Sequence, residues 1–461
     1  MAAALAAGTA QAQDLVLSYD QARQLARELL AAGNVEEANR VATQLLAEVP
    51  NDGTALAIIA ATAPALGDPV TGRKAGVRAY TVATTSDQRY EAARLTANAA
   101  ATNRQFSLAQ FWLRLARQSA PDDAARASVA QDYQLLRDLN PWNTSLSFGV
   151  RPSDNINNGS QGNTAFLQEN VDAGLASLLA AFGFYDPETG LRLLGDNERA
   201  LSGTELSFSF GTQYRLSATP TAATFLTLGA NADFYRLSDE ARTQAPGSKN
   251  GDFTRAGLNV GIVHRQIFSA GDAPTTFRAT VGSTWYGGEP NTRYLAFSAD
   301  QPFLLSERDR LTFGANVTLS RGASDDTITR RVGTTLDWRH ITTSGNAVDA
   351  GIGLSKSLSD LQDSTYTSLS ASVGYTFARP IGPVAVSTSL TWEVYDIGDT
   401  LYAPFDRIDH TLTARARFVL TEAELFGFQP VLTLSQRRNG STVDQFDTRS
   451  FDVGVDLQSS F

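Results

Sequence analysis

The carboxy-terminal segment from Phe451 to Phe461 alternates between apolar and polar residues. Its apolar residues fall on one parity, and they are Phe451, Val453, Val455, Leu457 and Phe461. Because successive side chains of a strand point to opposite faces, this segment has one apolar face and one polar face. A soluble protein would leave the apolar face of such an edge strand uncovered. An outer-membrane barrel turns that face to lipid and the polar face to its lumen. The segment therefore predicts a closing strand of a transmembrane barrel.

The same five residues suggest how the barrel is assembled. Their spacing, with an aromatic residue at the end, resembles the terminal signal by which the barrel assembly machinery of Gram-negative bacteria recognises its clients. We therefore expect this machinery and outer-membrane lipid as partners of the chain.

The two-residue period recurs throughout the part of the chain from 142 to 461. Alternating segments begin near residues 144, 204, 222, 253, 275, 292, 310, 328, 347, 365, 384, 408, 430 and 450. These are fourteen segments, and single-chain bacterial barrels have an even number of antiparallel strands. Connections after even-numbered segments are mostly short, as at Ala218 to Pro220, whereas the longest connection, Pro152 to Gly203, follows the first segment. This alternation predicts a barrel whose first strand runs outward from the periplasm.

Composition is compatible with export and excludes some functions. The chain has 461 residues, no Cys, a formal charge of -10 and a mean hydropathy of -0.18. No run approaches the roughly 20 apolar residues of a membrane-spanning helix, and an acidic chain argues against nucleic acid as a partner. Residues 1–12 are small and apolar and end in Ala10-Gln11-Ala12, a cleavage pattern, so we interpret them as the remnant of a signal peptide. The alternative is an Ala-rich leader of a cytoplasmic protein.

Residues 14–141 have a helical texture instead. Ala and Leu recur at helical spacing, and turns at Gly33, Gly67 and Asn103 interrupt them at intervals of about 34 residues. Paired helices with this period are typical of tetratricopeptide repeats. The sequence therefore predicts a periplasmic helical solenoid with Phe106, Phe111 and Trp112 in its core; a plain helical bundle is the alternative. The middle repeat is weak, because it lacks large apolar residues and contains Pro64.

Parity also separates lipid-facing from lumen-facing candidates in the barrel. Aromatic residues near strand ends suit the girdles at the membrane interfaces, and they are Tyr235, Trp285, Tyr286, Trp338, Tyr375, Phe377, Trp392 and Tyr395. Core aromatics of a soluble β-sandwich are the alternative. Charged residues fall on the lumen parity: Arg255, Arg331, Asp337, Arg339, Glu393, Arg415 and Arg417. We expect structural ion pairs among them, with a cationic lining that guides substrate as the alternative.

No catalytic or cofactor-binding motif emerges from the sequence. His264, His340 and His410 are the only histidines, and none has metal-ligand spacing. No Gly-rich phosphate loop and no G-x-S-x-G elbow occurs. We therefore predict that the protein is not an enzyme and uses no cofactor and no metal.

The architecture and one short motif resemble a known family. Helical repeats before a fourteen-stranded barrel, with Arg151-Pro152-Ser153-Asp154-Asn155-Ile156-Asn157-Asn158-Gly159-Ser160 after the first strand, resemble the surface lipoprotein assembly modifier (Slam) family. The residues that carry the motif are Pro152, Asp154, Asn155, Ile156 and Asn157. Without the resemblance, Asn, Asp and Gly at these positions predict a structured loop.

The resemblance implies a translocator that takes a protein client, lipidated or soluble, across the outer membrane as a monomer. The repeats would bind the client in the periplasm and the barrel would provide the exit. Two alternatives share parts of this architecture: an exopolysaccharide export porin, and a general porin with an accessory periplasmic domain.

Overall fold

The chain forms two compact units, one ending at Asn140 and one beginning at Pro141. The computed structural model describes residues 17–166, 177–178, 180–183, 185–186, 191–269, 271–361, 364–397, 406–421, 423 and 428–459. The expected signal-peptide remnant, residues 1–12, and Phe461 lie outside these ranges. Among the described helices, none combines the length and apolar character that crossing a membrane requires.

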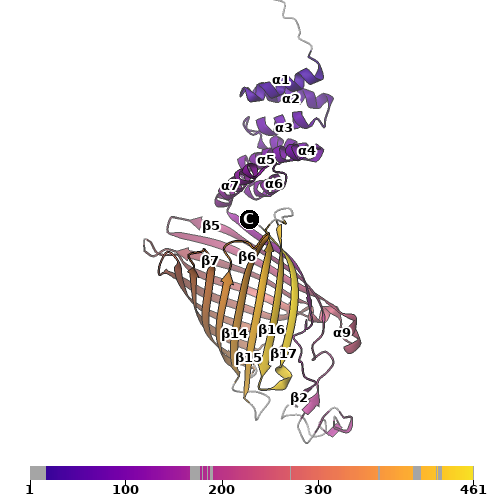
Figure 1. Cartoon of the computed structure of the whole chain (residues 1–461), viewed down its shortest axis with the longest axis vertical. Helices are drawn as coiled ribbons and strands as arrows, with labels where there is room; N and C mark the ends of the chain where they lie inside the picture. Colours follow the sequence, from indigo (N-terminus) through magenta and orange to yellow (C-terminus); the bar gives the residue numbers. More distant parts are fainter. Residues whose placement is uncertain are drawn as a thin grey trace, which may run out of the picture. The chain divides into compact units, whose positions relative to one another are not determined.

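The amino-terminal unit is a solenoid in which each helix packs on the next along the chain. Its helices are α1 Tyr19–Ala31, α2 Val35–Glu48, α3 Gly53–Thr62, α4 Pro69–Val82, α5 Ser86–Thr102, α6 Phe106–Gln118 and α7 Asp123–Leu139 (Figure 1). The recurring turns have a physical basis, since Gly33, Gly67 and Arg104 all adopt positive φ, at 78°, 85° and 55°. Left-handed residues end helices and let the chain double back. The three hairpins therefore follow the predicted period.

The weak middle repeat, α3 and α4, is a helix pair built on close approach rather than on large side chains. A Cβ at Gly76 would lie 2.2 Å from Oγ1 of Thr96 on α5, and one at Gly72 would lie 2.7 Å from Cδ of Pro64. Pro64 does not interrupt a helix, because α3 already ends at Thr62. Small residues here let the backbones pack tightly.

The core of the solenoid differs in one respect from the sequence expectation. Trp112 is buried and meets Tyr80 edge to face, with ring centroids 5.4 Å apart. Phe111, the neighbouring residue, is 49% exposed and was wrongly assigned to the core. Adjacent residues of a helix point about 100° apart, so both could not face the same neighbour.

Asp52 links the first two hairpins. Its buried carboxylate caps α3 by accepting a hydrogen bond from the amide of Ala55 at 2.9 Å. It also accepts a hydrogen bond from the Tyr19 hydroxyl at 2.8 Å and pairs with the Arg23 guanidinium at 2.9 Å. Partial burial and the Asp52 carboxylate together raise the pKa of Tyr19 to about 12.

We predict that Asp52→Ala destabilises the solenoid by about 2 to 4 kcal/mol, because a helix cap and two polar contacts to a buried charge are lost together. The helical circular-dichroism transition of the full chain in detergent should fall by about 10 °C. Asp20→Ala is the control, since Asp20 is 91% exposed and its ion pair with Arg23 is a surface pair. Equal transitions for both variants would contradict the role of Asp52.

The carboxy-terminal unit is a closed antiparallel barrel of fourteen strands, which confirms the predicted fold (Figure 1). The strands run in chain order around the wall, and β17 closes on β1. They are β1 Trp142–Ser153, β5 Gly203–Ala218, β6 Ala222–Leu237, β7 Arg255–Gln266, β8 Thr275–Tyr286, β9 Glu289–Leu304, β10 Asp309–Gly322, β11 Ile328–Ile341, β12 Ala347–Ser359, β13 Tyr366–Thr376, β14 Val384–Ile397, β15 Arg407–Leu420, β16 Phe428–Ser441 and β17 Thr448–Ser459.

The barrel has a loop end and a turn end. The loop end carries segments 154–202 and 238–254, and the turn end carries short connections such as 219–221. Segment 154–202 contains a small sheet that the sequence pattern does not reveal: β2 Thr164–Phe166, β4 Leu191–Leu193 and β3 Tyr185–Asp186, in that order. Segment 238–254 contains the helix α9 Asp239–Gln244. One loop-end connection departs from the expected length, because Gly287 and Gly288 alone join β8 to β9, both at positive φ.

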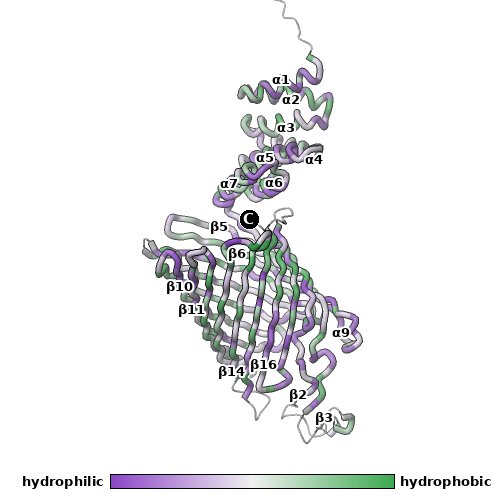
Figure 2. The backbone as a smooth tube through the Cα atoms, in the orientation of Figure 1, coloured by the Kyte–Doolittle hydropathy of each residue, from purple (hydrophilic) through white to green (hydrophobic). Residues whose placement is uncertain are grey.

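The wall of the barrel is apolar outside. Leu258, Val260 and Ile262 of β7 are exposed on one parity, and equivalent exposed residues occur on every other strand of the wall except β16, where Leu432 and Leu434 are partly exposed. Figure 2 shows the resulting alternation of apolar and polar residues along the strands. A closed barrel with such a surface satisfies its backbone internally and presents apolar side chains to lipid, as an outer-membrane barrel does.

Three of the aromatic residues assigned to the interface girdles lie on the inward parity instead: Tyr235, Tyr395 and Tyr286, the last of which pairs with the inward Arg255. Tyr235 is buried and its hydroxyl donates to Glu205 at 3.1 Å. The Tyr395 hydroxyl donates to Glu393 at 3.3 Å. Tyr235 and Tyr395 lie on the parity opposite to the exposed apolar residues of their strands. Parity, and not position near a strand end, therefore sets the direction of these side chains.

We predict that Val373→Arg impairs folding of the barrel whereas Ser372→Arg does not. These neighbours lie on opposite faces of β13, and Val373 is 49% exposed on the lipid face. Arginine facing the bilayer midplane costs about 2 to 4 kcal/mol, while an arginine in the lumen meets water. Folding into vesicles, measured as heat-modifiable migration on a gel, tests this. Equal folding of the two variants would mean that the parity is assigned wrongly.

Candidate functional site

The family-like motif completes the seam between the first and last strands. In the register of this seam, Val150 pairs with Val455 and Ser153 with Asp452, after which β1 ends. Beyond this point, side-chain hydrogen bonds replace the backbone pairing. The Asp154 carboxylate accepts a hydrogen bond from the Phe451 amide at 2.7 Å, and Asn155 Nδ2 donates one to the Arg449 carbonyl at 2.9 Å. The motif thus satisfies backbone groups of β17 that β1 no longer reaches.

The rest of the motif folds over the loop end of the barrel. Ile156 is 5% exposed and belongs to a buried cluster with Leu201, Tyr235, Leu237 and residues of segment 238–254. Asn157 joins the two limbs of the long loop, since its Nδ2 donates to the carbonyls of Asn197 and Arg199 at 2.9 and 2.8 Å. Segment 154–160 is therefore fastened to both β17 and β6.

Two cavities lie against this segment. We call the first the loop cavity; it has a volume of about 560 Å³ and is lined by amides and aromatic rings, among them Asn157, Asn158, Asn197, Tyr366, Tyr395, Asn439, Gln445 and Phe446. We call the second the arginine cavity; it has a volume of about 690 Å³, and Arg151, Arg255, Arg415, Arg417 and Arg437 are among its lining residues. Asn158 and Arg437 line both. The motif therefore stands between two hollows of the lumen.

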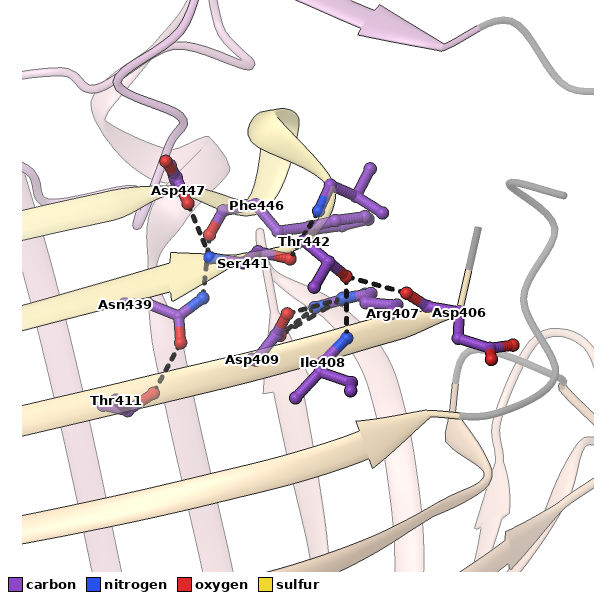
Figure 3. A network of polar contacts seen from close by, with 11 residues as sticks. Asp406, Arg407, Ile408, Asp409, Thr411, Asn439, Ser441, Thr442, Phe446 and Asp447 are labelled. Atoms are coloured by element: carbon purple, nitrogen blue, oxygen red, sulfur yellow. Dashed lines mark hydrogen bonds and ion pairs between the residues drawn. The ribbon is translucent and has the colours of Figure 1, made fainter. Parts of the chain in front are cut away.

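A polar network builds one wall of the loop cavity (Figure 3). Thr411 donates to Asn439 Oδ1 at 2.6 Å, and Asn439 Nδ2 donates to the Phe446 carbonyl at 2.8 Å. Arg407 pairs with Asp409 at 2.6 Å and lies 3.3 Å from the centroid of the Phe446 ring. The Arg407 and Asp409 side chains are only 15% and 8% exposed. The charges of Arg407 and Asp409 therefore neutralise each other within the wall, and neither is free to bind a ligand.

On the opposite side of the loop cavity, Glu198 is fixed by Arg192. The two guanidinium nitrogens donate to the carboxylate at 2.7 and 2.8 Å. These hydrogen bonds lower the pKa of Glu198, and the Gly195 amide adds to the effect. Because folding lowers this pKa, the Glu198 carboxylate stabilises the folded state fully above the ordinary value of 4.5. This stabilisation declines as the pH falls toward the lowered pKa.

The arginine cavity collects charges from strands that are far apart in sequence. Five arginines line it, together with three carboxylates: Arg151, Arg255, Arg415, Arg417, Arg437, Glu205, Glu393 and Asp452. Arg151 pairs with Glu205 at 3.1 Å, and Arg417 donates to Gln458. Among the described residues, no carboxylate lies within ion-pair distance of Arg255, Arg415 or Arg437. Arg255 stands opposite Asp233 in the β6–β7 register, so the cavity holds two arginines, Arg415 and Arg437, that form no ion pair within the described part of the chain and have no carboxylate opposite them in the ladder.

The structure places the predicted lumen residues in two groups. Four of them, Arg255, Glu393, Arg415 and Arg417, meet in the arginine cavity. Arg339 instead forms the expected structural pair, with Asp349 at 2.6 Å, and Arg331 lies 5.4 Å from the centre of the Tyr366 ring. Asp337 lies on the inward parity of β11, near Gly351. Arg151 and Arg437 were missed, although their inward parity was a usable signal.

The predicted assembly residues occupy the expected parity. Phe451, Val455 and Leu457 are exposed on the outer face of β17, and Val453 lies on the same parity. Their recognition during assembly stays a prediction.

We predict that Asn155→Ala loosens segment 154–202. The variant loses the bonds of Asn155 to the Gly159 amide and carbonyl, at 2.8 and 2.9 Å, and to Arg449. At about 1 kcal/mol for each of the three hydrogen bonds, this loss raises the open population roughly a hundredfold. Tryptic cleavage at Arg192 or Arg199 in the folded protein measures that population. Asn163→Ala is the control, since only the carbonyl of Asn163 is seen to bond in this loop; equal cleavage rates would contradict the anchoring role.

Comparison with known proteins does not assign a family. No protein-family model matches the chain, and no curated protein matches it in sequence. Among solved structures, it is similar to a bacterial polysaccharide outer membrane secretin, with a TM-score of 0.35, 9% identity and coverage of 69% of this chain and 98% of the other.

Two porins are similar at the same level. Acinetobacter baumannii OccAB3 has a TM-score of 0.33 and 10% identity, covering 68% of this chain and 99% of its own. A BenF-like porin from Pseudomonas fluorescens Pf-5 has a TM-score of 0.36 and 7% identity, covering 69% and 99%. Likeness this weak carries no argument about substrate. What the closed, lipid-facing wall itself supports is an outer-membrane β-barrel that follows a helical region.

Proposed function

We propose that the protein is an outer-membrane translocator that exports or displays a protein client, with the helical unit binding the client in the periplasm and the barrel providing the exit. The observation that carries the proposal is the union, in one chain, of a stacked helical solenoid and a barrel with a hollow, polar lumen. Stacked helix pairs present an extended surface suited to a partner chain. A porin for small solutes has no need of such a unit.

The solenoid offers a groove of suitable character. A cavity of about 540 Å³ opens between α5, α6 and α7 and is lined by Tyr90, Arg94, Leu95, Leu113, Leu135 and Leu136. Leu135 is 65% exposed, and Arg94 pairs with Asp132 beside it. Apolar side chains with a few polar groups at the edge are the lining that peptide-binding grooves use. Client recognition in this groove is part of the proposal.

The proposal extends to assembly and family. The barrel assembly machinery would recognise the carboxy-terminal strand β17, and the translocator would act as a monomer. The Asn155-Ile156-Asn157 phrase, fastened to the seam, supports a relationship to the Slam family.

A second candidate is export of a polysaccharide. The observation in its favour is the lining of the loop cavity, where tyrosine rings and several amides face one hollow. Aromatic faces and planar amides suit the apolar faces and hydroxyl groups of sugars. The two candidates differ in the substrate that fails to reach the surface when the solenoid is removed.

We predict that deletion of residues 14–140 leaves an assembled barrel while a surface-exposed protein accumulates in the periplasm. Leu135→Asp should reproduce this effect in the full chain, because a charge placed in the groove opposes apolar binding. Leu66→Asp is the control, since Leu66 is 44% exposed but lies outside the groove. Heat-modifiable migration checks the barrel, and comparison of surface proteomes checks the client.

Other outcomes of the same experiment reject the protein-client proposal. A fall in cell-surface polymer, with every surface protein in place, would favour the polysaccharide exporter. Unchanged surface proteins and polymer, with small-solute permeability retained, would favour a general porin.

A further inference from the structure

The arginine cavity lies on the inner face of the barrel beside the motif. Its lining residues come from eight strands that follow one another around the wall across the seam: β7, β6, β5, β1, β17, β16, β15 and β14. The lining residues lie on the parity opposite to the exposed apolar residues of their strands, which places the cavity inside the barrel and not on its outer face. The cavity therefore lies on the side of the lumen that carries the β1–β17 seam, against segment 154–160.

The charges of the cavity do not cancel. Arg151 and Glu205 neutralise each other at 3.1 Å, and Asp233 stands opposite Arg255 in the β6–β7 register. This leaves Arg415, Arg417 and Arg437 with two carboxylates, Glu393 and Asp452. Those two carboxylates bond to neutral groups: Glu393 accepts from the Tyr395 hydroxyl at 3.3 Å, and Asp452 accepts from the Ser450 hydroxyl at 3.4 Å. The excess charge is therefore positive, although the whole chain carries -10.

The arginines are also arranged for joint contact. Arg415 and Arg437 lie on the adjacent strands β15 and β16. In the register of these strands Arg415 is opposite Ser435 and Arg437 is opposite Thr413, so the two arginines are diagonal neighbours on the inner face. Arg417 follows Arg415 on the same inward parity. A guanidinium binds carboxylate or phosphate through two parallel hydrogen bonds, and a lysine cannot do this. Every cation of this cavity is an arginine.

We propose that the arginine cavity binds multivalent carboxylate or phosphate anions and makes the lumen selective for anionic substrates, with Arg415 and Arg437 as the central contacts. The inference rests on the proposed function only in requiring that substrate passes through the lumen. It adds that the transported molecule bears negative charge where it meets this cavity.

The first test is the reversal potential of the full chain in a planar bilayer under a gradient of KCl. A fixed charge about 8 Å from the path, screened at ~0.1 M salt, changes the ratio of chloride to potassium permeability about twofold. We predict anion selectivity for the parent and a fall of about fourfold for Arg415→Gln with Arg437→Gln. The control is Arg438→Gln, which removes the same charge from the next residue of β16, on the outer parity.

The second test is calorimetric titration of citrate, and separately of pyrophosphate, into the full chain in detergent. Loss of a charge-assisted hydrogen bond should weaken binding by about tenfold or more per arginine. Arg437→Lys should restore charge and selectivity but not the full affinity, since it keeps the charge without the fork. Preference for citrate identifies a carboxylate substrate, and preference for pyrophosphate identifies a phosphate one.

The outcomes separate the two proposals. If the parent conducts but has equal selectivity and equal citrate affinity to the double glutamine variant, the anion site is wrong and the channel stands. If the parent binds citrate through Arg415 and Arg437 but forms no channel, the anion site stands and passage through the lumen is wrong. Heat-modifiable migration of each variant shows that the barrel has folded.

Discussion

The demand that every backbone group in the membrane have a partner governs the whole carboxy-terminal unit. In hydrocarbon no water replaces a missing hydrogen bond, so a sheet must close on itself. Closure here depends on one seam, in which β17 pairs with Phe148 to Ser153 of β1. Beyond Ser153 the seam is continued by the side chains of Asp154 and Asn155, which bond to the backbone of β17. The motif is therefore a structural part of the closed wall as well as the start of the longest loop.

Closure also explains where the lumen is hollow and charged. Because most residues of the outer parity are apolar, most charged residues of the strands point inward, and opposite charges on neighbouring strands pair there, as Arg339 does with Asp349. Around the motif the pattern changes. Arg255, Arg415 and Arg437 have no carboxylate within ion-pair distance among the described residues, and the cavity between them stays open. The arginines of this cavity outnumber its carboxylates, and a lining made only of structural ion pairs does not require such an excess.

Parity and turn signals were sufficient for the wall, because both faces of a lipid-facing strand are constrained. The segment predicted near residue 292 is β9, and the turn that joins it to β8 is Gly287-Gly288. The same reasoning failed where tertiary contacts decide. Tyr235 was assigned to the interface by its place near a strand end, yet its hydroxyl finds Glu205 inside. One cavity brings Arg255 together with Arg415 and Arg437, and this depends on which strands are close in space. The small sheet β2–β4–β3 likewise depends on contacts between distant segments. No local sequence pattern predicts either.

The fastening of the motif has a consequence for the route of transport. Opening the wall at the β1–β17 seam would expose backbone amides and carbonyls to lipid, at several kcal/mol for each unsatisfied group. Releasing segment 154–160 exposes polar groups at the loop end, where water replaces their partners, so each hydrogen bond of Asn155 and Asn157 opposes release by only about 1 kcal/mol. The apolar burial of Ile156 adds about 1.5 to 3 kcal/mol. Displacing the motif within the lumen is therefore less costly than parting the strands, and the course past the arginine cavity is the one that the physics of the fold favours.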